Sequence, residues 1–382
     1  MQRSFLLAAA ALASAGVALA QTPPPPDRGD APAPAPLPPE SEADRATVVE
    51  RLATLLEENF VFPDVARRYA ATLRTKAAQG GYANLGERFA DTIVADLQAI
   101  HPDRHLRVSR GGAGMGGPQQ VRRVPGGGAA PGGPAGSPPG EPRRAMRMPD
   151  PSTAIGRSGW IADGVAYIEL GLFPGAPETL ERIARFLDEH QGARAIIFDI
   201  RGHRGGGLAE MDVIFSRLFA RETALVAMDT RLAVEQQRGS PVADGPALRR
   251  VGGPEGVVRR MHYAIPAGAA TPLREAQVYV LTSRRTGSAA EHFALSLKRT
   301  GRATLIGEPT GGAGHYGGIM DLGSGYSAFI PVGRTFDPDT DQGWEGTGVA
   351  PNVAVPADQA LDEALRRAGV APAQRRTLAS AG

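Results

Sequence analysis

The stretch AQVYVLTSRRTGSAAEHFALSLKRTGRATLIG, residues 276–307, decides the fold class. It begins with an apolar run typical of a buried strand, passes through a polar loop into an amphipathic helix, and ends in a second strand at ATLIG. The same alternation occurs upstream, where GVAYIELGLF and ARAIIFDI flank the helical PETLERIARFLDEH. Strands that alternate with helices predict an α/β domain with a largely parallel core sheet, whose catalytic groups lie where strands end.

Ser288 stands where the polar loop becomes the helix. The backbone N–H groups at a helix start are unpaired, so they favour developing negative charge and suit a nucleophilic serine. The same position suits a helix cap, because Glu291 follows three residues later, as in a capping box. From the residues alone, the pattern favours the cap over the nucleophile.

Three other stretches carry residue types that hydrolases use. Glycines 205–207 follow a buried strand, where backbone N–H groups can face a substrate oxygen, although such turns are also common without a ligand. His105 follows a helix-breaking proline at the start of a strand, which suits a general base or a surface histidine. Glu345, within WEGTGVAPNV, can orient a histidine or be a solvated loop acid.

The composition excludes several classes of protein. The 382 residues contain no cysteine, which excludes a disulfide framework, a thiolate nucleophile and cysteine-ligated zinc. The net charge is only +2 with both signs interspersed, so no nucleic-acid partner is expected. There is no H-E-x-x-H motif, and Pro102 prevents His101 and His105 from sharing a helix face. We therefore expect neither a metal nor another cofactor.

The ends of the chain and one internal segment are not expected to join the core. Residues 1–20 combine an arginine, an apolar run and a final Ala-Leu-Ala, which is typical of a secretory signal peptide cleaved near Ala20. This predicts a periplasmic or secreted protein that contacts a membrane only if the segment is retained. The other expected segments are a Pro-rich linker (21–42), a helical N-terminal domain (43–108), a Gly/Pro-rich insertion (109–157), an α/β core (158–371) and a flexible tail (372–382).

Taken together, these motifs resemble the tail-specific, or C-terminal-processing, serine peptidase superfamily. The resemblance is closest to the branch typified by interphotoreceptor retinoid-binding protein repeats and the tricorn protease core. It implies a Clp-protease/crotonase-like core of repeated β-β-α units behind a small helical domain, and peptide or protein substrates. The stretches that carry it are LLEENFVFPDVA, DRHLRV, FDIRGHRGGG, WEGTGVAPNVAV and residues 281–312.

The resemblance also implies roles for individual residues. Ser288 matches the nucleophile of the family, and the N–H groups of Gly206 and Ala289 match its oxyanion hole. His105 and Glu345 complete a tricorn-like Ser-His-Glu triad. Substrate-binding backbone is further expected at Gly205, Gly311 and Gly312.

The chain departs from the processing-protease branch at the residue that activates the serine. That branch uses a lysine in a G-K-G loop, where this chain has Ala313. Lys298 lies ten residues along the helix from Ser288, which is about 15 Å at 1.5 Å per residue. A Ser-Lys dyad is therefore not expected, and His203 and His315 compete with His105 for the role of base.

These observations predict an exported serine peptidase. The alternative is a non-catalytic module that binds apolar ligands or peptides on the same fold, as retinoid-binding relatives do. The sequence predicts no particular oligomeric state.

Overall fold

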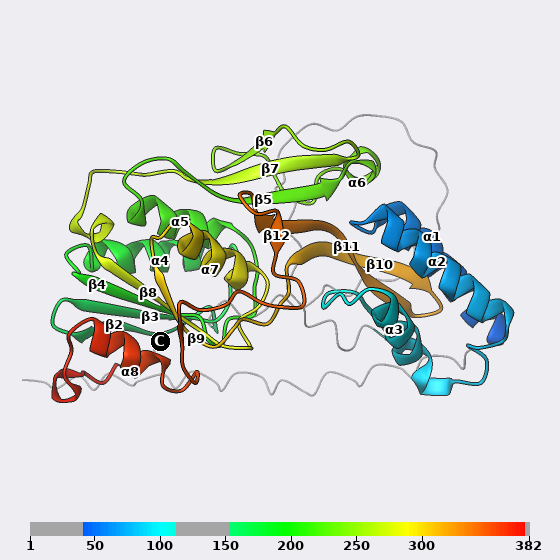
Figure 1. Cartoon of the computed structure of the whole chain (residues 1–382), viewed down its shortest axis with the longest axis horizontal. Coiled ribbons are helices and arrows are strands. Elements are labelled where there is room, and N and C mark those ends of the chain that lie inside the picture. Colours follow the sequence, from blue (N-terminus) through cyan, green and yellow to red (C-terminus); the bar gives the residue numbers. More distant parts are fainter. Residues whose placement is uncertain (1–40, 112–152, 379–382) are drawn as a thin grey trace, which may run out of the picture. The chain divides into compact units, whose positions relative to one another are not determined.

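The computed structural model describes residues 41–111 and 153–378 (Figure 1). The expected signal peptide (1–20), nearly all of the expected linker, residues 112–152 of the expected insertion and residues 379–382 lie outside the described residues. The described part contains a six-stranded and a seven-stranded sheet with helices packed on both.

The six-stranded sheet confirms the predicted parallel core. Its neighbouring strands are parallel except at one edge, where β2 runs antiparallel to β3. In spatial order its strands are β13 (Val353–Ala354), β9 (Thr304–Gly307), β8 (Gln277–Thr282), β4 (Ala195–Asp199), β3 (Val165–Leu170) and β2 (Ile155–Ala162).

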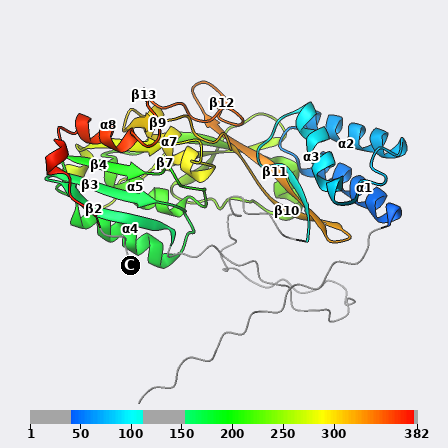
Figure 2. The same ribbon diagram turned by 90° about the horizontal axis from the view of Figure 1, so that it is seen from below.

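Alternate residues of these strands bury both faces of the sheet. Ile196 and Phe198 of β4 join the cluster under α4 (Pro177–Glu189), α5 (Ala209–Leu218) and α7 (Ala289–Arg299). Ala195 and Ile197 face the opposite side, under α8 (Ala360–Arg367). Figure 2 shows α8 and α4 on opposite sides of β2–β4. The two-residue period of a strand therefore explains why these runs are continuously apolar.

The seven-stranded sheet is antiparallel, and the sequence pattern predicts only its first strand, β1, which follows His105. Its central path is β1 (Arg107–Arg110), β11 (Tyr326–Asp337), β5 (Thr223–Arg231), β7 (Val257–Ala264) and β6 (Leu248–Val251). Two further strands pair with β11, namely β10 (His315–Gly323) and β12 (Gln342–Gly343). A short helix, α6 (Leu232–Arg238), follows β5.

The N-terminal helices pack on this second sheet. They are α1 (Glu42–Asn59), α2 (Pro63–Ala78) and α3 (Phe89–Ile100). Their apolar residues share one buried cluster with β1, β10 and β11, so the segment expected as a helical domain forms a common core with the sheet. This packing brings the α3–β1 loop, which carries His105, to the glycine loop that precedes β10.

At the other end, residues expected to form a flexible tail contact the core. The Arg376 N–H donates to the Ile161 carbonyl at 2.8 Å, and Leu378 packs on the cluster beneath α8. No helix within 41–111 or 153–378 is both long and apolar enough to cross a lipid bilayer.

Candidate active site

Ser288 has an unusual backbone conformation at the start of α7. Its φ is 58° and its ψ is −120°, a region that a residue other than glycine occupies at a cost of about 1–3 kcal/mol. Its N–H donates to Glu291 Oε2 at 2.7 Å, but the Ser288 side chain makes no capping hydrogen bond. The helix cap therefore accounts for the position of Glu291, but the Ser288 hydroxyl takes no part in the cap.

Glu291 forms hydrogen bonds to several segments around Ser288. Besides the Ser288 N–H, its buried carboxylate accepts the Thr310 hydroxyl at 2.6 Å and the N–H groups of Gly312 at 2.6 Å and Ala313 at 2.8 Å. Burial raises the pKa of Glu291, although all four hydrogen bonds act in the opposite direction. Sequence reasoning recognised only its helix-cap pattern, because the other partners lie about twenty residues away in the glycine loop.

Two unpaired backbone N–H groups belong to residues that line the same cavity as Ser288. The N–H groups of Gly206 and Ala289 donate to no other residue in the described part of the chain. Gly206 has a φ of 130°, and a Cβ there would lie 2.0 Å from the Phe173 carbonyl oxygen. Hydrogen bonds from Phe173 N–H to the Gly205 carbonyl and from Gly207 N–H to the Phe173 carbonyl hold this turn on either side. Only glycine fits this position.

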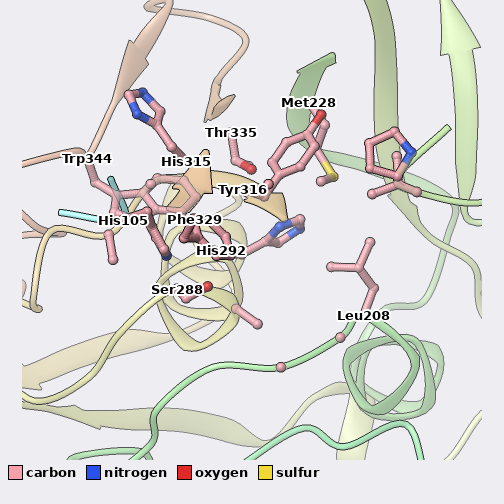
Figure 3. A pocket seen from close by; sticks show the side chains of 18 residues that line it. His105, Leu208, Met228, Ser288, His292, His315, Tyr316, Phe329, Thr335 and Trp344 are labelled. Carbon is pink, nitrogen blue, oxygen red and sulfur yellow. The ribbon is translucent and has the colours of Figure 1, made fainter. Parts of the chain in front are cut away.

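Ser288, Gly206, Ala289 and His105 line one cavity of about 60 Å³ (Figure 3). The His105 ring is buried and stacks on Phe329 with 5.7 Å between ring centroids. Neither ring nitrogen has a hydrogen-bond partner among the described residues. Burying a polar atom without a hydrogen bond costs free energy, and such atoms in native proteins often face a ligand or a reacting group.

Glu345 is placed to interact with His105. Its Oε2 lies 3.9 Å from His105 Nδ1, a charge-pair distance that is too long for a hydrogen bond. The carboxylate accepts the N–H groups of Arg104 at 2.6 Å, Gly314 at 2.6 Å and His315 at 3.1 Å. Burial alone would raise the pKa of Glu345, but His105, His315 and the Arg104 N–H outweigh it and hold the pKa well below its usual value.

His315 also lines the cavity, but its ring is bound elsewhere. Its Nδ1 lies 2.7 Å from Asp103 Oδ2, and Figure 3 shows the ring pointing away from Ser288. Burial lowers the pKa of His315, but the hydrogen bond and the charge of Asp103 reverse this and raise it. Asp103 Oδ1 also accepts the N–H of His105 at 2.8 Å, so this pair holds the His105 loop against β10.

His203, the other competitor, is not among the residues that line the cavity. Its Nδ1 accepts the Gly205 N–H at 3.0 Å, and its ring packs edge-on against Phe173 with 4.2 Å between centroids. Complete burial lowers the pKa of His203 to about 3, so the ring stays neutral.

The three glycines expected to bind substrate are not among the residues that line the cavity. The N–H of Gly205 is bound to His203, that of Gly311 to the Thr286 carbonyl at 2.7 Å, and that of Gly312 to Glu291. These N–H groups shape the two loops, while Ala313 and Gly314 of the second loop line the cavity itself.

Both lysines of the chain are engaged away from Ser288. Lys298 Nζ donates to the Ala350 carbonyl at 2.7 Å, and Lys76 pairs with Asp96 at 2.8 Å. Neither lines the cavity, which agrees with the exclusion of a Ser-Lys dyad.

One group of side chains beside the cavity has the composition of a metal site. Asp103, His105 and Glu345 each offer one ligand atom, and these atoms lie within 4.8 Å of one another. Each of the four carboxylate oxygens of Asp103 and Glu345 already accepts at least one hydrogen bond. The arrangement therefore fits a hydrogen-bonded acid–base group better than a cation site.

Two family profiles and one characterised relative match this chain. The profile described as peptidase family S41 matches residues 164–355. A second profile, the N-terminal domain of peptidase family S41 in eukaryotic interphotoreceptor retinoid-binding protein, matches residues 41–126. A carboxyl-terminal-processing protease from Picosynechococcus sp. is 24% identical over 196 residues, which cover 51% of this chain and 40% of that protein. The chain thus matches only two fifths of the length of this relative.

Solved structures share the fold at low sequence identity. A protein from Parabacteroides merdae is 17% identical with a TM-score of 0.51, covering 83% of this chain and 90% of that one. Mature CPAF is 13% identical with a TM-score of 0.50, covering 86% and 95% of the two chains.

Proposed function

Because the chain belongs to peptidase family S41, we propose that it is an exported serine peptidase that hydrolyses peptide bonds with Ser288 as nucleophile. His105 is the general base and Glu345 orients it. The substrates are peptides or proteins. The observation that carries this proposal is the surroundings of Ser288: its strained backbone, two unpaired N–H groups and an unpaired histidine ring share one cavity.

The reaction begins with acylation of Ser288. His105 takes the proton of the Ser288 hydroxyl while Oγ attacks the scissile carbonyl carbon. The carbonyl oxygen becomes an oxyanion, which accepts hydrogen bonds from the N–H groups of Gly206 and Ala289. His105 then gives its proton to the departing amine, and the carbon–nitrogen bond breaks. Water, deprotonated by His105, hydrolyses the acyl-enzyme and releases the second product.

Glu345 stabilises the imidazolium that forms in both halves of the reaction. Its low pKa keeps it ionised at neutral pH, so it presents a full negative charge to His105. The distance of 3.9 Å shortens to hydrogen-bond length as His105 becomes charged, because catalytic hydrogen bonds often tighten only when substrate binds.

Labelling with a fluorophosphonate tests this proposal. The wild-type chain should form one covalent adduct, which peptide mass spectrometry locates on Ser288, and Ser288→Ala should form none. Ser296→Ala is the matched control, because Ser296 lies on the same helix with a buried hydroxyl that has no partner among the described residues. It should label like the wild type. A wild-type chain that stays unlabelled would instead favour the non-catalytic binding module.

Export is proposed from residues 1–20. Expressed in a Gram-negative host, the full chain should reach the periplasm and begin at Gln21, whereas a chain started at Gln21 should remain in the cytosol. Full-length protein that stays uncleaved in the cytosol would contradict export.

A further inference from the structure

A chain of three polar side chains runs from the surface of the protein to the cavity. Asp212 on α5 is partly exposed, and its Oδ1 lies 2.8 Å from Nε2 of His262 on β7. Nδ1 of His262 lies 2.7 Å from Nε2 of His292 on α7. Both histidines are buried, and the proposed mechanism uses neither.

The carboxylate at one end fixes the direction of the hydrogen bonds. An ionised Asp212 only accepts, so His262 donates to it through Nε2–H. A neutral His262 then has an unprotonated Nδ1, which accepts from Nε2–H of His292. A neutral His292 is thereby left with an unprotonated Nδ1. Burial and the neighbouring His262 lower the pKa of His292 well below its usual value, which keeps this ring neutral.

His292 lines the same cavity as Ser288, one helical turn farther along α7 (Figure 3). Its Nδ1 has no hydrogen-bond partner among the described residues, and it is not one of their fully buried unpaired atoms. The nearby Tyr316 hydroxyl is occupied, because it donates to the Asp229 carbonyl at 2.9 Å and bonds to Thr230 at 2.7 Å. Leu208, Met228 and Val242 add apolar surface to the same cavity, which Thr335 also lines.

We propose that this part of the cavity is a specificity subsite, in which His292 Nδ1 accepts a hydrogen bond from a substrate side chain next to the scissile bond. The inference rests on the proposed peptidase function. The preferred side chain carries a hydrogen-bond donor, as threonine does.

Three peptides that differ in one residue isolate this hydrogen bond. Threonine and valine have nearly the same shape, but only threonine can donate. O-Methylserine has a similar size and offers an acceptor but no donor. Each is placed in turn at the two positions that flank the cleavage site. At one of them the wild-type enzyme should cleave the threonine peptide with kcat/KM on the order of tenfold above the other two.

Variants of the chain separate the hydrogen bond from packing. His292→Phe keeps a ring but removes the acceptor, so the threonine-to-valine ratio should fall to about one. Asp212→Ala leaves His292 in place but removes the acceptor that fixes which ring nitrogen of His262 and of His292 carries hydrogen. His292 Nδ1 can then also donate, so discrimination against O-methylserine should weaken. The second variant changes a partly exposed side chain, and it keeps the test decisive if His292→Phe does not fold. His190→Phe, a buried histidine at the end of α4, is the control and should keep the wild-type ratios.

Wild-type ratios near one at both positions would overturn the subsite, as would unchanged ratios in His292→Phe or Asp212→Ala. In each case Ser288-dependent cleavage would continue. Failure of the proposed function has a different outcome, because no peptide would then be cleaved in a Ser288-dependent way, and the subsite would fall with it.

Discussion

Replacing Glu291 with glutamine tests how Ser288 is held. The carboxylate accepts four hydrogen bonds, two at each oxygen. The glutamine oxygen preserves two of these bonds, but its amide nitrogen carries hydrogens and replaces the acceptor of the other two. Those partners are the N–H groups of Ser288 and Ala313 in one orientation, or the Gly312 N–H and the Thr310 hydroxyl, which can itself accept, in the other. Each buried donor left without an acceptor costs about 1–3 kcal/mol, so the expected loss of local stability is about 2–6 kcal/mol in the first orientation and about 1–3 kcal/mol in the second, against a total stability of about 5–15 kcal/mol for many domains.

The substitution should affect the reactivity of Ser288 more strongly than the stability of the whole fold. If the amide nitrogen replaces Oε2, the unpaired groups are the N–H of Ser288 and that of Ala313. Without these bonds, the left-handed Ser288 backbone relaxes and the hydroxyl moves away from the N–H groups of Gly206 and Ala289. The rate of fluorophosphonate labelling should therefore fall at least tenfold, and the urea midpoint of unfolding should also decrease.

Glu308→Gln is the matched control, because Glu308 lies in the same glycine loop and its side chain makes no hydrogen bond to the described residues. It should match the wild type in both measurements. Wild-type labelling and wild-type stability in Glu291→Gln would refute the argument that Glu291 holds the Ser288 conformation.

Two further predictions concern the oxyanion hole and the triad acid. Gly206→Ala should lower kcat on the order of 10²–10³-fold, because the new Cβ would lie 2.0 Å from the Phe173 carbonyl oxygen and would displace one oxyanion donor. Gly202→Ala is the control and should leave kcat nearly unchanged, because a Cβ at Gly202 meets no atom within 4 Å. Equal kcat in the two variants would argue against the Gly206 N–H as an oxyanion donor. The ionised Glu345 should stabilise the fold above pH 4.5 relative to Glu345→Gln, and this advantage should disappear as the pH falls, because the unfolded chain binds the proton first. Urea unfolding at pH 7 and at pH 3 measures it, and a difference between the two proteins that grows toward acid pH would show the wrong sign.

The parallel sheet could be predicted because its strands are buried on both faces. Continuous apolar runs such as Ile196–Phe198 leave little choice of structure. The antiparallel sheet could not be predicted, because charged residues lie on its buried positions. Arg260 of β7 is fully buried between Glu235 and Asp244, and in the sequence it reads as an exposed position.

The same reasoning explains which parts of the site could be predicted. The position of Ser288 follows from local pattern, since a strand, a loop and a helix start are adjacent in the chain. The role of Glu291 and the chain from Asp212 through His262 to His292 depend on hydrogen bonds between segments about 20 to 50 residues apart. No local period encodes such pairs.

The measurement that tests the central claim most directly is a double-mutant cycle on peptide cleavage. It compares kcat/KM for wild type, Ser288→Ala, His105→Ala and the double variant, with His315→Ala measured in parallel. Residues that act as one unit are not additive, so each single variant of the pair should lose about 10⁴-fold or more and the double variant should lose little beyond that. His315→Ala should retain more activity than His105→Ala. Additive losses, or near-wild-type activity in His105→Ala together with an inactive His315→Ala, would contradict the assignment of His105 as the base for Ser288.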